Sequence, residues 1–134
     1  MDVLREQLMR HEGLRLSVYD DGWGNPTIGW GHNLKEPITE EVAEKLLDSD
    51  IAKAITDCYK LPRSLRNKLN VARTRVVANM IFNMGIGRVM TFKKMIKAIE
   101  ERNFNDAAAE MVSSRWAKQV GQRAVELAEI MRHG

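Results

Sequence analysis

Residues 11–32 read HEGLRLSVYDDGWGNPTIGWGH, and this is the only stretch of the chain with β character. Apolar and mostly polar residues alternate from Leu14 to Tyr19, which predicts a half-buried strand. Asp20-Asp21-Gly22 has the composition of a tight turn, and a second extended run continues to Trp30. The glycines in that run mark positions where backbone or a ligand approaches closely. The stretch therefore predicts a small β region near the N-terminus.

Helical periodicity surrounds this β region on both sides. Apolar residues recur at helical spacing over 2–11, and Gly13 follows as a helix stop. After residue 39 every pattern is helical, beginning with a long apolar stripe over 39–59. Residues 76–84 are apolar on almost every face, which is typical of a helix at the centre of a helical lobe. Shorter amphipathic helices are predicted over 92–99, 104–112 and 120–131.

These patterns predict an α+β fold in a single domain, since 134 residues suit one domain of ~100–200 residues. A β-containing lobe is expected over residues 13–38, and a linking helix over 39–59. The helical lobe is expected to comprise residues 60–134 together with the helix over 2–11.

The charge distribution is asymmetric although the net charge is only +3. Residues 1–60 hold 12 acidic and 7 basic side chains, whereas residues 61–134 hold 6 acidic and 14 basic ones. Such a division suits an anionic partner or two lobes that attract each other. The chain has no recognised nucleic-acid-binding motif, so we expect no nucleic-acid partner.

Several other classes are disfavoured by composition. The longest stretch without a charged residue or a histidine, from Val76 to Gly87, has 12 residues, short of the ~18 needed to span a bilayer, so stable membrane insertion is not expected. The N-terminus has no basic segment followed by an apolar run, so no signal peptide is predicted. Cys58 is the only cysteine and cannot form an internal disulfide. The three histidines are scattered, and neither a metal site nor a cofactor is predicted.

The densest cluster of reactive side chains lies within the β region. Glu12 stands where the first helix stops, Asp21 stands in the turn, and Thr27 follows on the second extended run. Two carboxylates on separate elements that face one gap can divide into an acid and a base. The alternative is that Glu12 only ends a helix and that Asp20 and Asp21 only shape a turn. The residue types alone leave both interpretations open.

The order of these motifs resembles the N-terminal signature of the T-even phage lysozymes, the endolysins of glycoside hydrolase family 24. The signature is carried by residues 11–16, 19–21 and 27–32, with a Glu-x8-Asp-x5-Thr spacing that selects Asp21 over Asp20. The similarity continues through residues 38–50, 79–85, 106–108 and 114–116, and at Arg123.

This resemblance implies a lysozyme-like fold and a muramidase. Such an enzyme hydrolyses the β-1,4 bond between N-acetylmuramic acid and N-acetylglucosamine in bacterial peptidoglycan, with inversion, for host cell lysis. By the resemblance, Glu12 is the general acid, Asp21 is the second catalytic carboxylate, and Thr27 helps to place the attacking water. The resemblance also implies a set of substrate contacts: Gly31, Asn33, Phe82, Asn83 and Arg115. It further implies supporting residues, namely His32 paired with Asp50, and Arg123 beside Glu12.

The resemblance also sets expectations about partners and departures. We expect a monomer. Because no signal peptide or anchor is predicted, we also expect synthesis in the host cytoplasm and access to the cell wall with help from a separate holin-type protein. The loop over 33–37 is shorter than in the T-even form, and Met95 and Glu110 replace small polar sugar contacts. Two alternatives remain: a non-catalytic binding module for an anionic polymer, and a lytic transglycosylase, which needs no second carboxylate.

Overall fold

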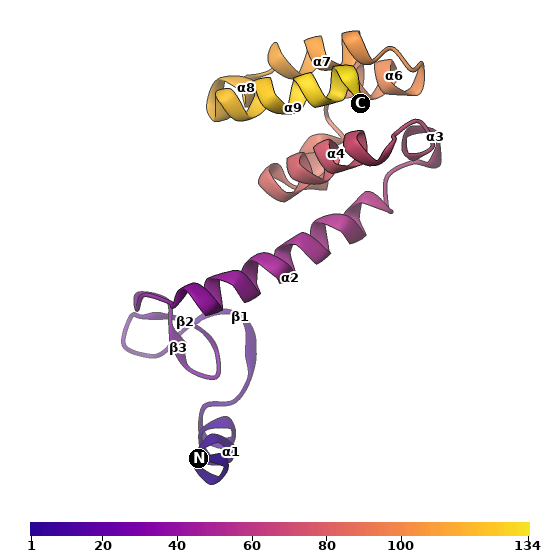
Figure 1. Cartoon of the computed structure of the whole chain (residues 1–134). Helices are drawn as coiled ribbons and strands as arrows, with labels where there is room; N and C mark the ends of the chain where they lie inside the picture. The colour runs from indigo at the N-terminus through magenta and orange to yellow at the C-terminus, as the bar shows by residue number, and fades with distance from the viewer. The chain divides into compact units, whose positions relative to one another are not determined.

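The computed structural model describes all of residues 1–134 and divides into two compact units, residues 1–44 and 45–134 (Figure 1). The predicted α+β class is confirmed, because helices dominate and the only sheet is small and three-stranded. The predicted assignment of the helix over 2–11 to the helical lobe stays a prediction. None of the helices has the length and apolar character needed to cross a membrane.

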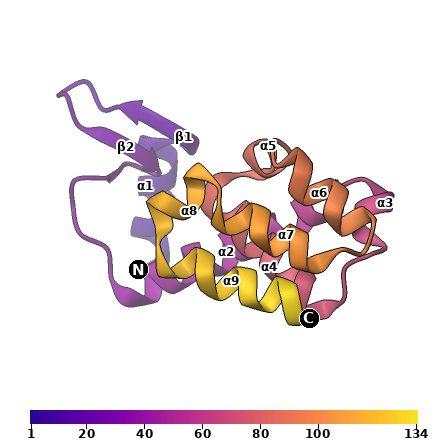
Figure 2. The ribbon, with the colours of Figure 1, turned by 90° about the horizontal axis from the view of Figure 1, so that it is seen from above.

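The first unit contains one helix, the sheet and the beginning of a long helix. Strands β1 and β2 are antiparallel neighbours (Figure 2), and β3 pairs with the other side of β2. The sequence pattern missed β3, because a two-residue strand is too short to show alternation. The elements are α1 (Asp2–Glu12), β1 (Arg15–Asp20), β2 (Pro26–Gly29), β3 (His32–Asn33) and the start of α2 (Glu40–Cys58).

The long helix α2 begins as its sequence indicates. The hydroxyl of Thr39 accepts a hydrogen bond from the backbone N–H of Val42 at 3.2 Å, which satisfies one free donor of the first turn. The helix continues into the second unit, where Ala54 and Cys58 are buried. The predicted span over 39–59 is confirmed within one residue at each end.

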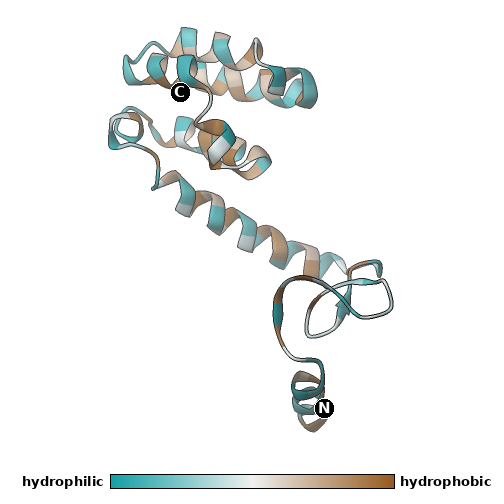
Figure 3. Cartoon of the chain, turned by 180° about the vertical axis from the view of Figure 1, so that it is seen from behind, coloured by the Kyte–Doolittle hydropathy of each residue, from teal (hydrophilic) through white to brown (hydrophobic).

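The second unit is entirely helical. Helix α7 packs between α6 and α9, and α9 also contacts α4 and α8. Hydrophilic and hydrophobic residues alternate along these helices (Figure 3), as amphipathic helices around a shared core require. The elements after α2 are α3 (Arg63–Arg66), α4 (Val71–Met84), α5 (Ile86–Val89), α6 (Lys93–Glu100), α7 (Phe104–Val112), α8 (Arg115–Val120) and α9 (Gln122–His133).

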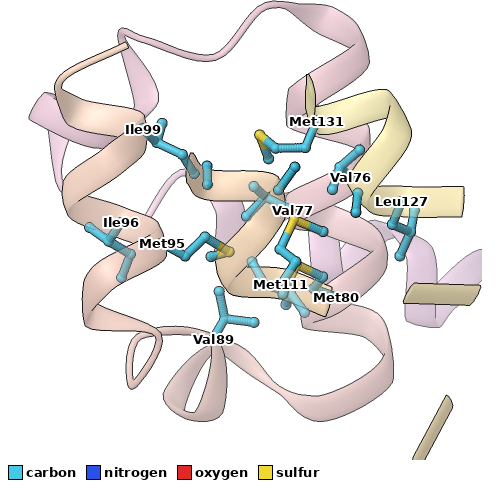
Figure 4. Packing of buried hydrophobic residues seen from close by; sticks show 14 of the residues in the cluster. Val76, Val77, Met80, Val89, Met95, Ile96, Ile99, Met111, Leu127 and Met131 are labelled. Carbon is cyan, nitrogen blue, oxygen red and sulfur yellow. The ribbon is translucent and has the colours of Figure 1, made fainter. Parts of the chain in front are cut away.

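Helix α4 supplies much of the core of this unit, which confirms its predicted central position. Its Val76, Val77 and Met80 are almost completely buried. Figure 4 shows them beside Met111 and Met131, which come from α7 and α9. Burying one such side chain stabilises the fold by ~1.5–3 kcal/mol. This packing holds the helices that carry the predicted substrate contacts of the second unit.

Candidate active site

Glu12 is the last residue of α1, and its position follows from the helix end. Gly13 has φ 71° and donates its N–H to the carbonyl of Met9 at 3.0 Å. A residue with positive φ ends the helix at low cost only if it is glycine. The chain turns there towards β1, which leaves the Glu12 carboxylate at the junction between the helix and the sheet.

The Glu12 side chain lies directly against Gly31, on the turn between β2 and β3. A β-carbon built on Gly31 would lie 2.8 Å from Glu12 Oε2 and 2.9 Å from its Cδ. Gly31 also has φ 77°, a conformation that side-chain-bearing residues rarely adopt. The structure therefore brings together one predicted catalytic residue and one predicted substrate contact.

Asp21 organises the loop between β1 and β2 through both of its carboxylate oxygens. Oδ1 accepts the backbone N–H groups of Trp23 at 2.7 Å and Asn25 at 3.2 Å. Oδ2 accepts the side-chain amide of Asn25 at 2.9 Å. These hydrogen bonds, the amide of Asn25 first, lower the pKa of Asp21 below its ordinary value of 3.8. Asp21 is therefore an exposed carboxylate that stays ionised at neutral pH.

The neighbouring Asp20 has a different set of partners. Its Oδ1 accepts the backbone N–H groups of Gly22 at 2.7 Å and Gly24 at 3.3 Å. Both aspartates thus shape the turn, as the alternative interpretation of Asp20 and Asp21 as turn residues predicted. Only Asp21 also receives a side-chain donor from Asn25.

Thr27 lies in the central strand β2, opposite Tyr19 of β1 and Asn33 of β3. It is buried, with 2% of its surface exposed, and its hydroxyl donates to the backbone carbonyl of Asn25 at 2.9 Å. Because the hydroxyl hydrogen is used in this bond, the lone pairs of the oxygen remain to accept a hydrogen bond. The cross-strand pairing also places Asn33, a predicted substrate contact, beside Thr27.

Asn25 connects two of the three predicted catalytic residues, and the sequence analysis missed it. Its side chain binds Asp21, and its carbonyl accepts the hydroxyl of Thr27. An asparagine before proline in a glycine-rich turn is a signal for local side-chain-to-backbone bonding. That signal was present, but it does not reveal which side chains are joined.

The predicted site residues of the second unit occupy separate surfaces. Phe82 and Arg123 line a cavity of about 380 Å³ between α2, α4 and α9. Arg115 lines a larger groove of about 790 Å³, together with Met95 and Glu110. The two substituted positions, Met95 and Glu110, therefore both lie on this groove. Its basic side chains are Arg88, Lys93, Lys94 and Arg115.

Two of these residues also have structural partners. Asn83 accepts the indole N–H of Trp116 at 2.8 Å, which joins α4 to α8. Arg123 donates from Nε and Nη2 to Asn79 Oδ1 at 3.0 and 2.7 Å, which joins α9 to α4. Asn79 is a further residue that the site prediction did not include. The predicted pairing of Arg123 with Glu12 stays a prediction, as does that of His32 with Asp50.

Two arginines of the second unit, Arg66 and Arg73, make contacts within that unit. Arg66 donates to the carbonyl of Leu61 at 2.9 Å. Arg73 donates to the carbonyls of Met131 and Arg132, and its guanidinium lies 3.5 Å from the ring centroid of Phe104. These contacts give two of the arginines structural roles within the helical unit, which weakens the binding-module interpretation.

Local surroundings determine the protonation state of Cys58. Burial, together with the neighbouring Asp57, raises the pKa of the Cys58 thiol above 9.0, which keeps it protonated and unreactive at neutral pH. No three His, Cys, Asp or Glu side chains lie close enough together to hold a metal ion.

Comparison with known proteins supplies the family. The profile of the family described as "Phage lysozyme" matches residues 9–132. The chain is 30% identical to "Probable T4-type lysozyme 2" of Dictyostelium discoideum, over 98% of this chain and 94% of that protein. It is 30% identical to "Endolysin" of Acyrthosiphon pisum secondary endosymbiont phage 1, over 87% of this chain and 80% of that protein.

A third relative shows the same region inside a larger protein. The chain is 28% identical to "Pre-baseplate central spike protein Gp5" of Enterobacteria phage T4, over 98% of this chain but 28% of that protein. The alignment with the Dictyostelium protein spans 160 positions, so that relative has residues which this chain of 134 lacks. The family match covers nearly the whole chain and includes all three predicted catalytic residues. The chain therefore belongs to the phage lysozyme family and is a glycoside hydrolase of the lysozyme type.

Proposed function

We propose that the protein hydrolyses the β-1,4 bond between N-acetylmuramic acid and N-acetylglucosamine in bacterial peptidoglycan, with inversion at the anomeric carbon. The observation that carries the proposal is the hydrogen-bonded chain from Asp21 through Asn25 to Thr27. An ionised carboxylate and a hydroxyl that can only accept are the two groups needed to hold one attacking water.

The proposed reaction divides the work between two carboxyl groups. Glu12, in its protonated form, donates its proton to the glycosidic oxygen as the bond to the anomeric carbon breaks and the electron pair leaves with that oxygen. The water oxygen attacks the anomeric carbon from the opposite face, and one of its protons passes to Asp21. Thr27 accepts the other hydrogen of the water, which directs an oxygen lone pair at the sugar.

Residues of both units are proposed to contact the glycan. In the first unit these are Gly31 and Asn33, which lie beside Glu12 and Thr27 respectively. In the second unit they are Phe82, Asn83 and Arg115. The exposed amide of Asn83 keeps its N–H groups for a sugar oxygen while its carbonyl accepts from Trp116.

The supporting pairs are proposed from the resemblance. His32 pairs with Asp50, which connects the β region to α2. Arg123, already held by Asn79, helps to position Glu12. Neither pair takes part in bond breaking.

We also propose a setting for the reaction. The enzyme acts as a monomer on the cell wall after synthesis in the host cytoplasm, and a separate holin-type protein gives it access. The excess of basic residues over 61–134 steers it to the anionic wall, an effect that salt weakens.

Glu12→Gln tests the proposal, because the amide keeps the shape of the side chain but cannot donate the proton. We expect the loss of turbidity of purified peptidoglycan to slow by ~10²–10⁴-fold, while the melting temperature and co-sedimentation with cell walls stay unchanged. Glu6→Gln, an exposed substitution earlier on the same helix, is the matched control and should remain fully active. Normal lysis by folded Glu12→Gln protein would disprove the assignment.

The products of the same reaction separate the two alternatives. A non-catalytic binding module releases no new reducing ends. A lytic transglycosylase closes a 1,6-anhydro ring instead of adding water. The presence of both Asp21 and Thr27 favours hydrolysis, since a transglycosylase has no water to activate.

A further inference from the structure

Asn25 has an unusual concentration of contacts for one residue of an exposed turn. Its side-chain Nδ2 donates to Asp21 Oδ2 at 2.9 Å, and its backbone N–H donates to Asp21 Oδ1 at 3.2 Å. Its carbonyl accepts the Thr27 hydroxyl at 2.9 Å and the backbone N–H of Asp21 at 3.1 Å. One residue thus contacts both oxygens of the proposed base and the hydroxyl of the proposed water-placing residue.

The direction of these hydrogen bonds determines how the Asp21 carboxylate and the Thr27 hydroxyl can interact with a bound water. Two donors from Asn25 favour the charged form of the Asp21 carboxylate and restrain its rotation. Thr27 must donate to the carbonyl of Asn25, so its oxygen faces any bound water only as an acceptor. A water held by two acceptors donates both of its hydrogens and keeps a lone pair for attack.

We propose that Asn25 is a positioning residue, which fixes the Asp21 carboxylate and the Thr27 hydroxyl relative to each other so that both accept from the same water. The proposal rests on the proposed function of Asp21 and Thr27. It adds a residue that bonds to neither the glycan nor the water and acts through the two that do.

The electrostatic surroundings of Asp21 are simple, which makes the proposal testable by titration. The adjacent carboxylate of Asp20 accepts N–H groups of Gly22 and Gly24. Tyr19 is the neighbouring titratable group on β1 and pairs with Thr27. No charged side chain is among the causes that lower the pKa of Asp21, and the amide of Asn25 is the largest of them.

The experiment compares Asn25→Ala and Asn25→Asp in the full-length protein. Asn25→Ala removes the amide donor, so kcat on soluble peptidoglycan chains should fall ~10-fold or more while KM stays near the wild-type value. In a carbon-13 NMR titration, the pKa of Asp21 should rise towards 3.8. The acidic limb of the kcat profile should move to higher pH together with it.

Asn25→Asp distinguishes positioning from a merely structural role in the turn. Aspartate suits turns nearly as well as asparagine, so a structural role predicts that Asn25→Asp is more active than Asn25→Ala. Positioning predicts the reverse order, because a second carboxylate repels Asp21 where the amide donated to it. The pKa of Asp21 should then rise further than in Asn25→Ala.

Asn103→Ala is the matched control. Asn103 also donates its amide to an aspartate, Asp106 Oδ2 at 2.7 Å, but in the helical unit. This variant should lose stability and leave both kcat and the titration of Asp21 unchanged. An unmoved Asp21 titration in Asn25→Ala, or higher activity in Asn25→Asp than in Asn25→Ala, overturns the proposal. The proposed function itself is tested separately, by the lytic activity of Glu12→Gln.

Discussion

Glu12 and Gly31 touch in a way that leaves no space for a side chain at position 31. The carboxylate Oε2 lies 2.8 Å from where a β-carbon of residue 31 would be, well inside ordinary van der Waals contact. The atom that would be struck is the far end of a flexible side chain. A methyl group there displaces the proposed acid by at least about 0.6 Å and leaves the backbone in place.

Gly31→Ala should therefore reduce catalysis more than folding. We expect kcat to fall ~10–100-fold, because small misplacements of a catalytic group have effects of this size. Positive φ adds a stability loss of ~1–2 kcal/mol. Gly29→Ala is the control, since Gly29 has φ 72° but no atom within 4 Å of its β-carbon position. It should lose similar stability and keep its kcat. A raised KM with normal kcat in Gly31→Ala would instead mean that the methyl group obstructs the sugar.

Asp21→Asn should change how stability depends on pH. The hydrogen bonds of Asp21 lower its pKa in the folded state, so its ionisation stabilises the fold at pH values above the ordinary 3.8. That contribution disappears as the pH falls through the lowered folded-state pKa. The melting temperature of Asp21→Asn should thus lie below that of wild type at pH 6 and approach it below about pH 4. A constant difference across this range would contradict the prediction.

The stereochemistry of the product tests the roles of Asp21 and Thr27. Inversion converts the β-linked glycan into an initial α-anomer, which proton NMR of fresh products detects before mutarotation. We expect Thr27→Ala and Asp21→Asn both to impair turnover, and Thr27→Ser to impair it least because it keeps the hydroxyl. An initial β-anomer means retention, which requires a covalent carboxylate and not an activated water.

His32→Asn should lower stability more than it lowers turnover per folded molecule, because the proposed pair with Asp50 is structural. Loss of a hydrogen bond to a charged partner costs ~1.5–3 kcal/mol. Asp50→Asn should cost a similar amount, and the double variant should cost little more than either single one. Asp48→Asn, two residues away on the same helix, is the control. An unchanged melting temperature with lost activity in His32→Asn would make the histidine catalytic.

Much of the fold was determined by local sequence patterns. The alternation over 14–19, the turn at 20–22 and the helical stripes predicted every element longer than six residues, since periodicity and turn composition act over a few neighbouring residues. The two-residue β3 and the short helices α3, α5 and α8 were not predicted, because a strand of two residues and a helix of fewer than two turns show no clear period. The spacing of Glu12, Asp21 and Thr27 was likewise readable in the sequence.

Only the tertiary structure decided which side chains meet. The order of residues shows glycine at 31, but not that its missing β-carbon makes room for Glu12, 19 positions earlier in the chain. The turn composition marks Asn25 as a loop residue, but not as the residue that joins Asp21 to Thr27. The sequence predicted Asn83 as a substrate contact, but not that its side-chain carbonyl accepts the indole N–H of Trp116 from α8. Hydrogen bonds and steric exclusion act over a few ångströms in space, so contacts between distant residues exist only once the backbone has folded.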